Sequence, residues 1–492
     1  MRDLTELALE TCSKEGATYA DIRIATIKDE DISIKKGNIN TLSLSTEKGF
    51  GIRTIANGGL GFAGSFEVTP EEIKRVAKLA VRIAKASGST RKNPIKFVDV
   101  EIVKDNYKTA IQKDPFAIAT EKKIELLVEV DKQLGQYNPE LIKMTQADYR
   151  GHQEDKIFAS SEGSYITQLI TFCGGGFSAT AISPGTPPQR RSFPGSFRGD
   201  FSTKGYEYFE GLKLLDNIEK TAEEAIALTT AKACPTEKTT LLLDGHQLML
   251  QIHESCGHPT ELDRVLGTEA AYAGTSFMTP DLLGKLHYGS KYVNMTADCT
   301  LPGGLGTFGY DDEGVKAKRT PLVKEGLFVG YQSSRETAAI IGLKESSAGM
   351  RADSPQKLPL VRMVNINLEP GDWKRDELIA DTKYGILMTT NKSWSIDDKR
   401  LNFQFGTEIA YEIIDGEIKN LIKNPTYTGI TPDFWGSLDA HSKDDWRLWG
   451  TPNCGKGQPG QVMYVGHGCA TARFQNVRVG VMKEATATDG IQ

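Results

Sequence analysis

Two histidines that stand five residues apart, His253 and His258 in the segment QIHESCGHPTELD, restrict the local backbone more than any other feature of this sequence. A regular α-helix turns by roughly 100° per residue, so five steps place the two imidazoles about 140° apart. Both rings reach one point only if the helix loosens into i→i+5 bonding or ends between them. Gly257 offers a permissive backbone just before the second histidine, and Pro259 lacks the N–H that would continue the helix. The spacing therefore predicts a distorted helix end that brings both rings together.

The residues of this segment have the chemistry of a hydrolytic metal site. Imidazoles bind zinc, the ion acidifies a water, and a neighbouring carboxylate, here Glu254, accepts the proton. The chain has only seven histidines in 492 residues, so two in one six-residue window are a notable concentration. The alternative is an ordinary polar helix end without an ion, because short motifs give many false positives.

The motif and several further blocks resemble the TldD/PmbA metallopeptidase family, also called modulators of DNA gyrase, and in particular its TldD-type members with an H-E-x-x-x-H motif. The blocks that carry the resemblance are Glu261, Tyr310–Gly314 (YDDEG), the run Arg351, Pro359, Arg362, Met363 and Asn365, Cys454–Gln458 (CGKGQ), and Val477–Gly480 (VRVG). They cover most of residues 240–480, whereas the first 235 residues match the family in arrangement more than in amino-acid sequence. Pro259 and Leu262 depart from the small residues usual in the family, and the cysteine block is one residue shorter.

The resemblance implies a zinc-dependent metallopeptidase. His253, His258 and Cys454 correspond to the ligands of one zinc ion per subunit, and Glu254 corresponds to the general base. The resemblance also implies short or unfolded peptides as substrates. It further implies a dimer, formed either by two copies or with a PmbA-type paralogue that lacks the metal motif.

A catalytic zinc ion takes three protein ligands and leaves one position for water, so a third ligand is needed. From the residues alone Cys454 is better explained as a small buried thiol, and only the resemblance reverses that judgement. Glu261 could itself be the third ligand, but it is so close to His258 in sequence that it is expected to orient this histidine instead. His467 and Cys469, two apart on a predicted strand, are a rival pair of ligands, although ordinary strand residues are the commoner explanation.

Arg351 and the acidic run Asp311, Asp312 and Glu313 are the remaining site candidates. They are polar enough to line a cleft, around the metal ligands or against the substrate. The carboxylates could grip a peptide amino group or hold a loop in place. The sequence leaves these two roles open.

The composition is that of an ordinary globular protein, with 39% hydrophobic and 25% charged residues. The formal net charge of −5 and the lack of a long Lys/Arg run argue against a nucleic-acid partner, so the gyrase label gains no support. No stretch approaches the ~20 apolar residues of a membrane span, and the N-terminus does not read as a signal peptide. The seven scattered cysteines suit a reducing compartment. We therefore expect a cytoplasmic protein without a nucleic-acid or membrane partner.

The pattern along the chain predicts an α+β protein of two domains, with an N-terminal α+β domain over residues 1–235 and a β-rich domain over residues 236–492. The first domain is expected to combine an antiparallel sheet with helices. Residues 173–200, with a cysteine and three glycines followed by several prolines, are interpreted as a connector, with a mobile substrate-covering loop as the alternative. The helices expected in this domain span about residues 4–12, 69–86, 119–134 and 212–232.

The second domain is expected to be barrel-like or a sandwich and to carry the metal-site helix. A strand over residues 239–243 precedes that helix, and short helices are expected near 335–343 and 374–381. Zinc hydrolysis of peptide bonds is the first hypothesis for the function. The alternative is a non-catalytic peptide-binding or regulatory subunit, whose structural metal would have four protein ligands.

Overall fold

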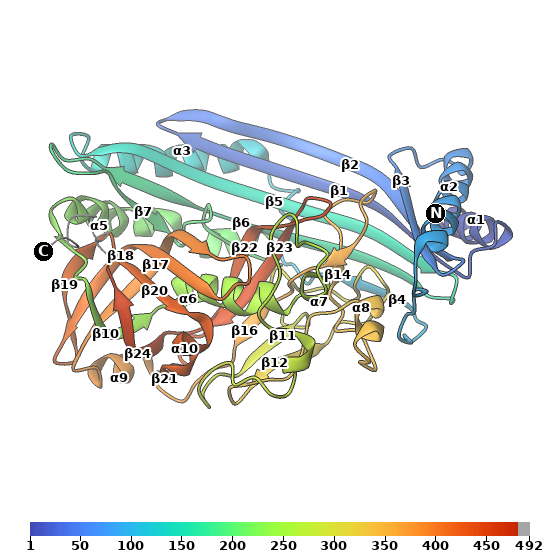
Figure 1. Cartoon of the computed structure of the whole chain (residues 1–492). Helices are drawn as coiled ribbons and strands as arrows, with labels where there is room; N and C mark the ends of the chain where they lie inside the picture. Colours follow the sequence, from blue (N-terminus) through green and yellow to red (C-terminus); the bar gives the residue numbers. More distant parts are fainter. Residues whose placement is uncertain (481–492) are drawn as a thin grey trace, which may run out of the picture.

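The computed structural model describes residues 1–480, so the last residues of the predicted C-terminal domain, 481–492, lie outside the described residues. The long strands of the N-terminal half form one layer, and the C-terminal half packs against it as a thicker body (Figure 1). The protein is α+β, as the sequence predicts, with an antiparallel sheet first and a β-rich half second. Within residues 1–480 no helix is long and apolar enough to cross a membrane.

The N-terminal sheet has the strand order β3-β2-β1-β5-β6-β4, and β7 and β8 also pair with β6. Only the pairing of β4 with β6 is parallel. Ile22 and Ile24, and again Ile32 and Ile34, recur at every second position of β1 and are buried, as the two-residue period of a strand requires. The strands are β1 (Tyr19–Lys35), β2 (Asn38–Ala56), β3 (Gly59–Ser65), β4 (Lys104–Lys108), β5 (Ile142–Ser160), β6 (Tyr165–Ala181), β7 (Gln189–Phe193) and β8 (Asp200–Ser202).

The connector predicted over residues 173–200 is wrong, because β6 runs through the glycines to Ala181 and β7 and β8 follow it. A Cβ at Gly174 or Gly175 would lie 2.1 Å from the backbone oxygen of Asp200 or Asp148 respectively. The glycines therefore serve close backbone packing. Since glycine is depleted in ordinary strands, the same residues concealed this strand in the sequence.

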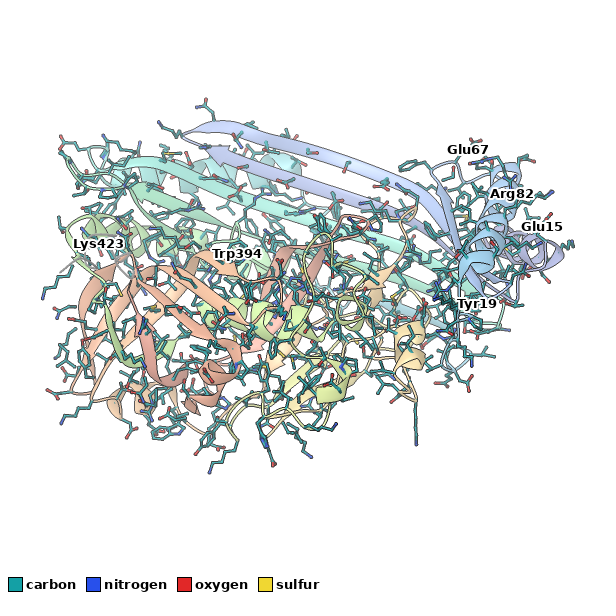
Figure 2. The ribbon with its side chains drawn as sticks, viewed as in Figure 1. Glu15, Tyr19, Glu67, Arg82, Trp394 and Lys423 are labelled. Carbon is teal, nitrogen blue, oxygen red and sulfur yellow. The ribbon has the colours of Figure 1, made fainter. Side chains whose placement is uncertain are left out.

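Helices α1 and α2 pack at one end of the sheet, where Figure 2 labels Glu15 and Arg82, and α3 and α5 pack nearer the other end. Each pair closes its own hydrophobic core. The helix expected over 212–232 starts later, because Lys213 adopts a left-handed φ of 49° that a helix excludes and a 3₁₀ turn then precedes α5. The helical elements are α1 (Arg2–Lys14), α2 (Pro70–Thr90), α3 (Thr120–Tyr137), α4 (Tyr206–Gly211), a 3₁₀ turn (Leu214–Asn217) and α5 (Ile218–Thr230).

Five strands of the C-terminal half close into a barrel in the order β17-β10-β24-β20-β18, because β18 pairs again with β17. The predicted β-rich domain is thus built on a closed barrel, whose core includes Leu241, Leu243, Phe405 and Tyr427. Strands β9, β19 and β21 extend the barrel sheet. The strands are β9 (Lys232–Ala233), β10 (Glu237–Leu243), β17 (Tyr384–Ile396), β18 (Asn402–Ile414), β19 (Glu417–Lys423), β20 (Thr426–Ile430), β21 (Leu438–His441) and β24 (Ala472–Val479).

The metal-motif helix α6 (Gly245–Ile252) follows β10 and packs against β17 and against the hairpin β22–β23. All eight of its residues are buried, so the helix is enclosed on every side. Both short helices predicted from the sequence are present as α8 and α9. The remaining elements are β22 (Arg447–Lys456), β23 (Gln461–Cys469), β11 (Met295–Asp298), β12 (Arg319–Lys324), β13 (Leu327–Phe328), β16 (Ile366–Leu368), β14 (Met350–Arg351), β15 (Leu360–Val361), α7 (Leu262–Val265), a 3₁₀ turn (Pro280–Leu282), α8 (Arg335–Ile340), α9 (Arg375–Ala380) and α10 (Thr431–Gly436).

Candidate metal centre

The motif helix loosens at its C-terminal end, as the spacing of the histidines predicts. α6 passes into a π turn over His253–Gly257, in which the N–H of His258 donates to the His253 carbonyl, and a 3₁₀ turn follows over His258–Thr260. This i→i+5 bond lowers the rotation per residue, so five steps carry the second ring less far around the helix and closer to the first. The role predicted for Gly257 is wrong, because its φ of −58° is an ordinary helical value. Glycine is needed there because a Cβ would lie 2.2 Å from the Sδ of Met363.

The structure brings His253, His258 and Cys454 together. Their ligand atoms all lie within 4.8 Å of one another, and all three residues are buried. Cys454 reaches the imidazoles from β22, and its Sγ lies 3.9 Å from His258 Nε2. Burial raises the pKa of the Cys454 thiol, and the Arg362 guanidinium is one of the neighbouring groups that outweigh burial and hold the pKa below its usual value.

This donor set fits a catalytic metal site. Two imidazoles and a thiol that is biased toward thiolate are the donors that zinc prefers, and three protein donors leave one position for water. The helix and the hairpin that supply the donors are separate elements. The group therefore depends on the packing of α6 against β22 and β23.

Hydrogen bonds fix which nitrogen each imidazole turns toward the group. His258 Nδ1 lies 2.9 Å from Glu261 Oε2, and a carboxylate only accepts, so Nδ1 carries the hydrogen and Nε2 is free to ligate. His467 Nδ1 donates to the Ile366 carbonyl at 3.2 Å, so His467 Nε2 accepts from His253 Nδ1 at 2.9 Å. Burial lowers the pKa of all three histidines, which keeps the rings neutral. Both candidate ligands thus present a lone pair on Nε2.

The rival ligand pair does not face the group. His467 contacts His253 as a hydrogen-bond acceptor, whereas Cys469 donates through its Sγ to the Gly245 carbonyl at 3.2 Å. Sequence reasoning treated His467 as a competitor for the metal. Its actual contact depends on a packing of β23 against α6 that the sequence does not reveal.

Glu254 lies directly beside the donors and is 4% exposed. Its Oε2 accepts a hydrogen bond from Nη1 of Arg400, in the turn between β17 and β18. Sequence reasoning missed Arg400, because a single arginine in a polar turn gives no periodic or motif signal. The structure therefore adds a cation to the predicted carboxylate.

Lys456, two residues after Cys454, anchors the thiol-bearing strand to the motif. Its Nζ donates to Asp263 at 2.7 Å and lies 3.4 Å from carboxylate oxygens of both Glu261 and Glu269. The lysine and these carboxylates are buried, and the three negative charges raise the pKa of Lys456 although burial lowers it. Lys456 belongs to the CGKGQ block of the sequence, but the residues that it contacts lie far away in the sequence. Glu261 thus contacts both His258 and the anchor of Cys454.

Arg351 is tied to backbone carbonyls. Its Nη1 donates to the Tyr464 carbonyl at 3.0 Å, and its Nη2 donates to the Met363 carbonyl. The side chain is buried and joins β14 to β23. These contacts place Arg351 as a brace of the scaffold behind Cys454.

The acidic run faces the N-terminal sheet. Asp312 accepts from Arg23 Nη1 at 2.9 Å and from Lys156 Nζ at 2.7 Å, and Glu313 accepts from Arg53 Nη1 at 2.7 Å. Asp311 binds the backbone of its own loop and of β14, through the N–H groups of Glu313, Val315 and Met350. Of the two roles that the sequence left open, these contacts favour holding a loop. They join the two halves of the molecule by buried ion pairs.

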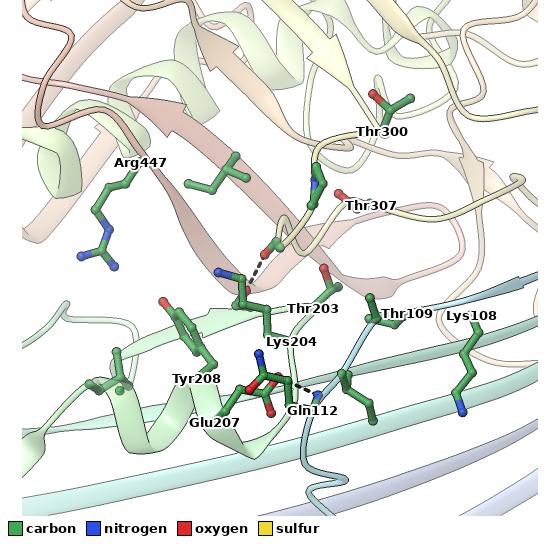
Figure 3. Close-up of a pocket in the computed structure, with 18 of the residues that line it drawn as sticks. Lys108, Thr109, Gln112, Thr203, Lys204, Glu207, Tyr208, Thr300, Thr307 and Arg447 are labelled. Atoms are coloured by element: carbon green, nitrogen blue, oxygen red, sulfur yellow. Dashed lines mark hydrogen bonds between the residues drawn. The ribbon is translucent and has the colours of Figure 1, made fainter.

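A cavity of about 1040 Å³ lies between the two halves, at a different place (Figure 3). Lys204 and Tyr208 line it from the N-terminal half, and Thr300, Thr307 and Arg447 line it from the C-terminal half. None of the three metal donors lines it, nor does Glu254. The cavity is therefore separate from the candidate metal centre.

Models of one protein family match almost the whole chain. The PmbA/TldA metallopeptidase domain 1 matches residues 20–84, the central domain matches 113–233, and the C-terminal domain matches 236–481. Similar curated proteins include the metalloprotease MJ0996 of Methanocaldococcus jannaschii, 33% identical over 95% of this chain and 98% of that protein. A metalloprotease of Methanothermobacter thermautotrophicus is 30% identical over 95% of this chain and 96% of its own length.

Solved structures show the same fold at low sequence identity. TldE from Thermococcus kodakarensis has a TM-score of 0.73 and 17% identity, covering 97% of this chain and 100% of that one. A Thermotoga maritima protein has a TM-score of 0.75 and 15% identity, with the same coverage of both chains.

Proposed function

This chain belongs to the PmbA/TldA metallopeptidase family, and from that premise we propose that it is a zinc-dependent enzyme that hydrolyses peptide bonds, with Glu254 as the general base. The observation that carries the proposal is the convergence of His253, His258 and Cys454 to within 4.8 Å beside a buried carboxylate. A relative from Saccharolobus solfataricus, 24% identical over 94% of this chain and 97% of its own length, is named a zinc metalloprotease TldD homolog.

His253 and His258 would hold the ion through Nε2, and Cys454 through its thiolate. When bound, zinc supplies a Lewis acid for the peptide carbonyl and acidifies the attacking water. Glu254 then accepts the proton of that water on the carboxylate oxygen that Arg400 leaves free, and delivers it to the leaving nitrogen. One ion per subunit is proposed, because the donors form one such group among residues 1–480.

Short or unfolded peptides are the proposed substrates. The donors and Glu254 are all buried, so a scissile bond reaches them only on a chain that extends into the protein. A folded substrate presents its peptide bonds on a rigid convex surface and cannot do this.

We also propose a dimer, formed by two copies or with a PmbA-type paralogue. β3 pairs with β2 only over residues 50–56, so within residues 1–480 the outer edge of β2 over 38–46 has no partner strand. Leu42 and Leu44 on this edge are 47% and 63% exposed. An exposed hydrophobic edge strand favours pairing with another chain.

A cytoplasmic location is proposed because Cys454 must stay reduced and all seven cysteines are free.

Metal analysis beside a digestion assay on denatured protein tests the proposal. Wild-type protein should contain zinc and cleave the substrate. Glu254→Gln should keep zinc but lose cleavage by at least ~100-fold, and Cys454→Ser should lose zinc affinity. Cys256→Ala is the matched control, because this buried thiol lies in the motif but outside the donor group. Full cleavage by Glu254→Gln would show that another group is the base, and a metal-free, inactive wild type would favour the non-catalytic binding subunit.

A further inference from the structure

Arg400 places its guanidinium against the carboxylate proposed as the base. Nη1 donates to Glu254 Oε2, and the two side chains are only 15% and 6% exposed. Nε is buried without a hydrogen-bond partner, and Nη2 makes no hydrogen bond to any other part of the described chain. A buried N–H without an acceptor is energetically unfavourable. Open donors beside the reacting groups therefore point to an acceptor that arrives with the substrate.

Three other buried arginines near the centre use their terminal nitrogens differently. Arg362 donates to the carbonyls of Cys454 and Gln461, Arg351 donates to two other backbone carbonyls, and Arg264 donates to three. Those contacts brace loops and strands. The side chain of Arg400 instead donates its one hydrogen bond to the carboxylate of Glu254.

The turn that carries Arg400 is itself held firmly. Asp397 accepts from the backbone N–H groups of Leu401 and Asn402 at 2.8 and 3.1 Å, and the Arg400 carbonyl accepts from Thr431 Oγ1 at 3.0 Å. Arg400 adopts a left-handed φ of 64°, which is an unfavourable conformation for a residue other than glycine. The surrounding contacts hold the backbone in this conformation, so the guanidinium is preorganised before substrate binds.

We propose that Arg400 is a further catalytic residue, whose open Nε and Nη2 donors bind the oxygen of the scissile carbonyl as negative charge develops on it. The inference rests on the proposed peptidase function. In this proposal Arg400 donates hydrogen bonds to two partners, Glu254 and the carbonyl oxygen of the substrate.

The movement of charge during the reaction explains why one guanidinium serves both partners. Glu254 takes a proton from the attacking water while the new C–O bond forms and the carbonyl π electrons move to the carbonyl oxygen. The negative charge thus passes from Glu254 to that oxygen, and Arg400 stays beside it. When the C–N bond breaks, the electrons return to the carbonyl, and the proton leaves Glu254 for the departing nitrogen. The Arg400–Glu254 ion pair is then restored.

A phosphonamidate peptide, built on a sequence that the wild-type enzyme cleaves, is the probe, because its tetrahedral anionic oxygen imitates the developing charge. We compare wild type, Arg400→Gln and Arg400→Lys, with Lys399→Gln as the control. Lys399 is an exposed cation of the same turn. Zinc content, kcat, KM, and the affinities for the phosphonamidate and for the unmodified product peptide are measured for each.

Arg400→Gln should keep zinc, lower kcat about 100-fold, change KM by less than about threefold, and weaken phosphonamidate binding about 100-fold while product binding stays constant. Arg400→Lys should fall between this variant and wild type, and Lys399→Gln should match wild type. The decisive measurement repeats Arg400→Gln in the Glu254→Gln background. If Arg400 touches the substrate oxygen, the loss of phosphonamidate affinity persists there.

If that loss disappears in the Glu254→Gln background, Arg400 only positions Glu254 and the proposal is overturned. Equal loss of phosphonamidate and product affinity also overturns it. These failures leave the proposed function intact as long as wild type cleaves denatured protein and binds the phosphonamidate. A wild type that does neither contradicts the peptidase function itself, and the role of Arg400 falls with it.

Discussion

Replacing Asp312 with asparagine perturbs the buried ion pairs between the two halves of the molecule with little change in side-chain size. The Asp312 carboxylate accepts from Arg23, from Lys156 and from the Ala352 backbone N–H. The side chains of Asp312, Arg23 and Lys156 are 1%, 3% and 8% exposed. Burial raises the pKa of Asp312, but Lys156 and Arg23 outweigh it and hold the pKa below its usual value. The carboxylate is therefore ionised, and asparagine removes a charge that two buried cations need.

Removing one partner of a buried ion pair costs about 3–5 kcal/mol. In the variant Arg23 still donates to the Lys357 carbonyl at 2.6 Å, and Lys156 still forms its ion pair with Glu154 at 3.2 Å. Neither cation is therefore left wholly unpaired. We therefore expect the lower end of the range, about 3 kcal/mol. This is a large part of a net stability of ~5–15 kcal/mol.

Urea unfolding of the zinc-loaded protein measures the effect. All five tryptophans, at 373, 394, 435, 446 and 449, lie in the C-terminal half, so their fluorescence reports that half, whereas far-ultraviolet circular dichroism reports both. In Asp312→Asn the dichroism should begin to change at lower urea than the fluorescence, because the sheet no longer gains stability from the other half.

Glu72→Gln is the control for this experiment. Its partner Arg75 is 62% exposed, so this surface pair should contribute less than about 1 kcal/mol. If Asp312→Asn costs no more than Glu72→Gln and its two transitions coincide, the buried ion pairs do not couple the halves.

Three further variants test individual contacts. His467→Phe removes the acceptor for His253 Nδ1, so zinc affinity should fall about 10–100-fold in a chelator competition, and unchanged affinity would refute the tautomer assignment. His246 is buried, and burial lowers its pKa from 6.5 to about 3, so the unfolded chain gains a proton first as the pH falls. Wild type should thus lose about 2 kcal/mol of stability between pH 7 and pH 5 relative to His246→Phe, and parallel pH profiles in denaturant would show that this residue contributes nothing. Gly257→Ala brings a methyl group to 2.2 Å from the Met363 sulfur, so it should cost about 1–3 kcal/mol and lower zinc occupancy. Calorimetry of the double variant with Met363→Ala should show recovery, and no recovery would mean that the clash lies elsewhere.

The parts of the molecule that follow from local rules could be predicted from the sequence. The π turn after α6 is a geometric consequence of the five-residue spacing of His253 and His258. Strand β1 follows from isoleucines at every second position. The strand through Gly174 and Gly175 was missed, since its residues are selected for contact with neighbouring backbone and carry no strand signal.

The contacts around the candidate centre could not be predicted in the same way. Arg400 and Glu254 are 146 residues apart, and Lys456 and Asp263 are 193 apart. Such pairs depend on how the barrel, the helix and the final hairpin pack, which no local pattern encodes. The acidic run Asp311, Asp312 and Glu313 could not be assigned either, because three carboxylates suit a substrate cleft and a loop-holding role equally well. Only the positions of Arg23 and Arg53 beside them decide between the two roles.

The third candidate ligand, Cys454, comes 196 residues after His258 in the chain. A ribosome makes the two imidazoles first, so an ion that meets the growing polypeptide finds an incomplete group of donors. Tight capture has to wait until the hairpin of β22 and β23 has been synthesised and has docked on the helix. Long-range contacts of this kind also form late in folding. On the proposed function, the polypeptide therefore gains its hydrolytic capacity only after this hairpin has been translated and has docked.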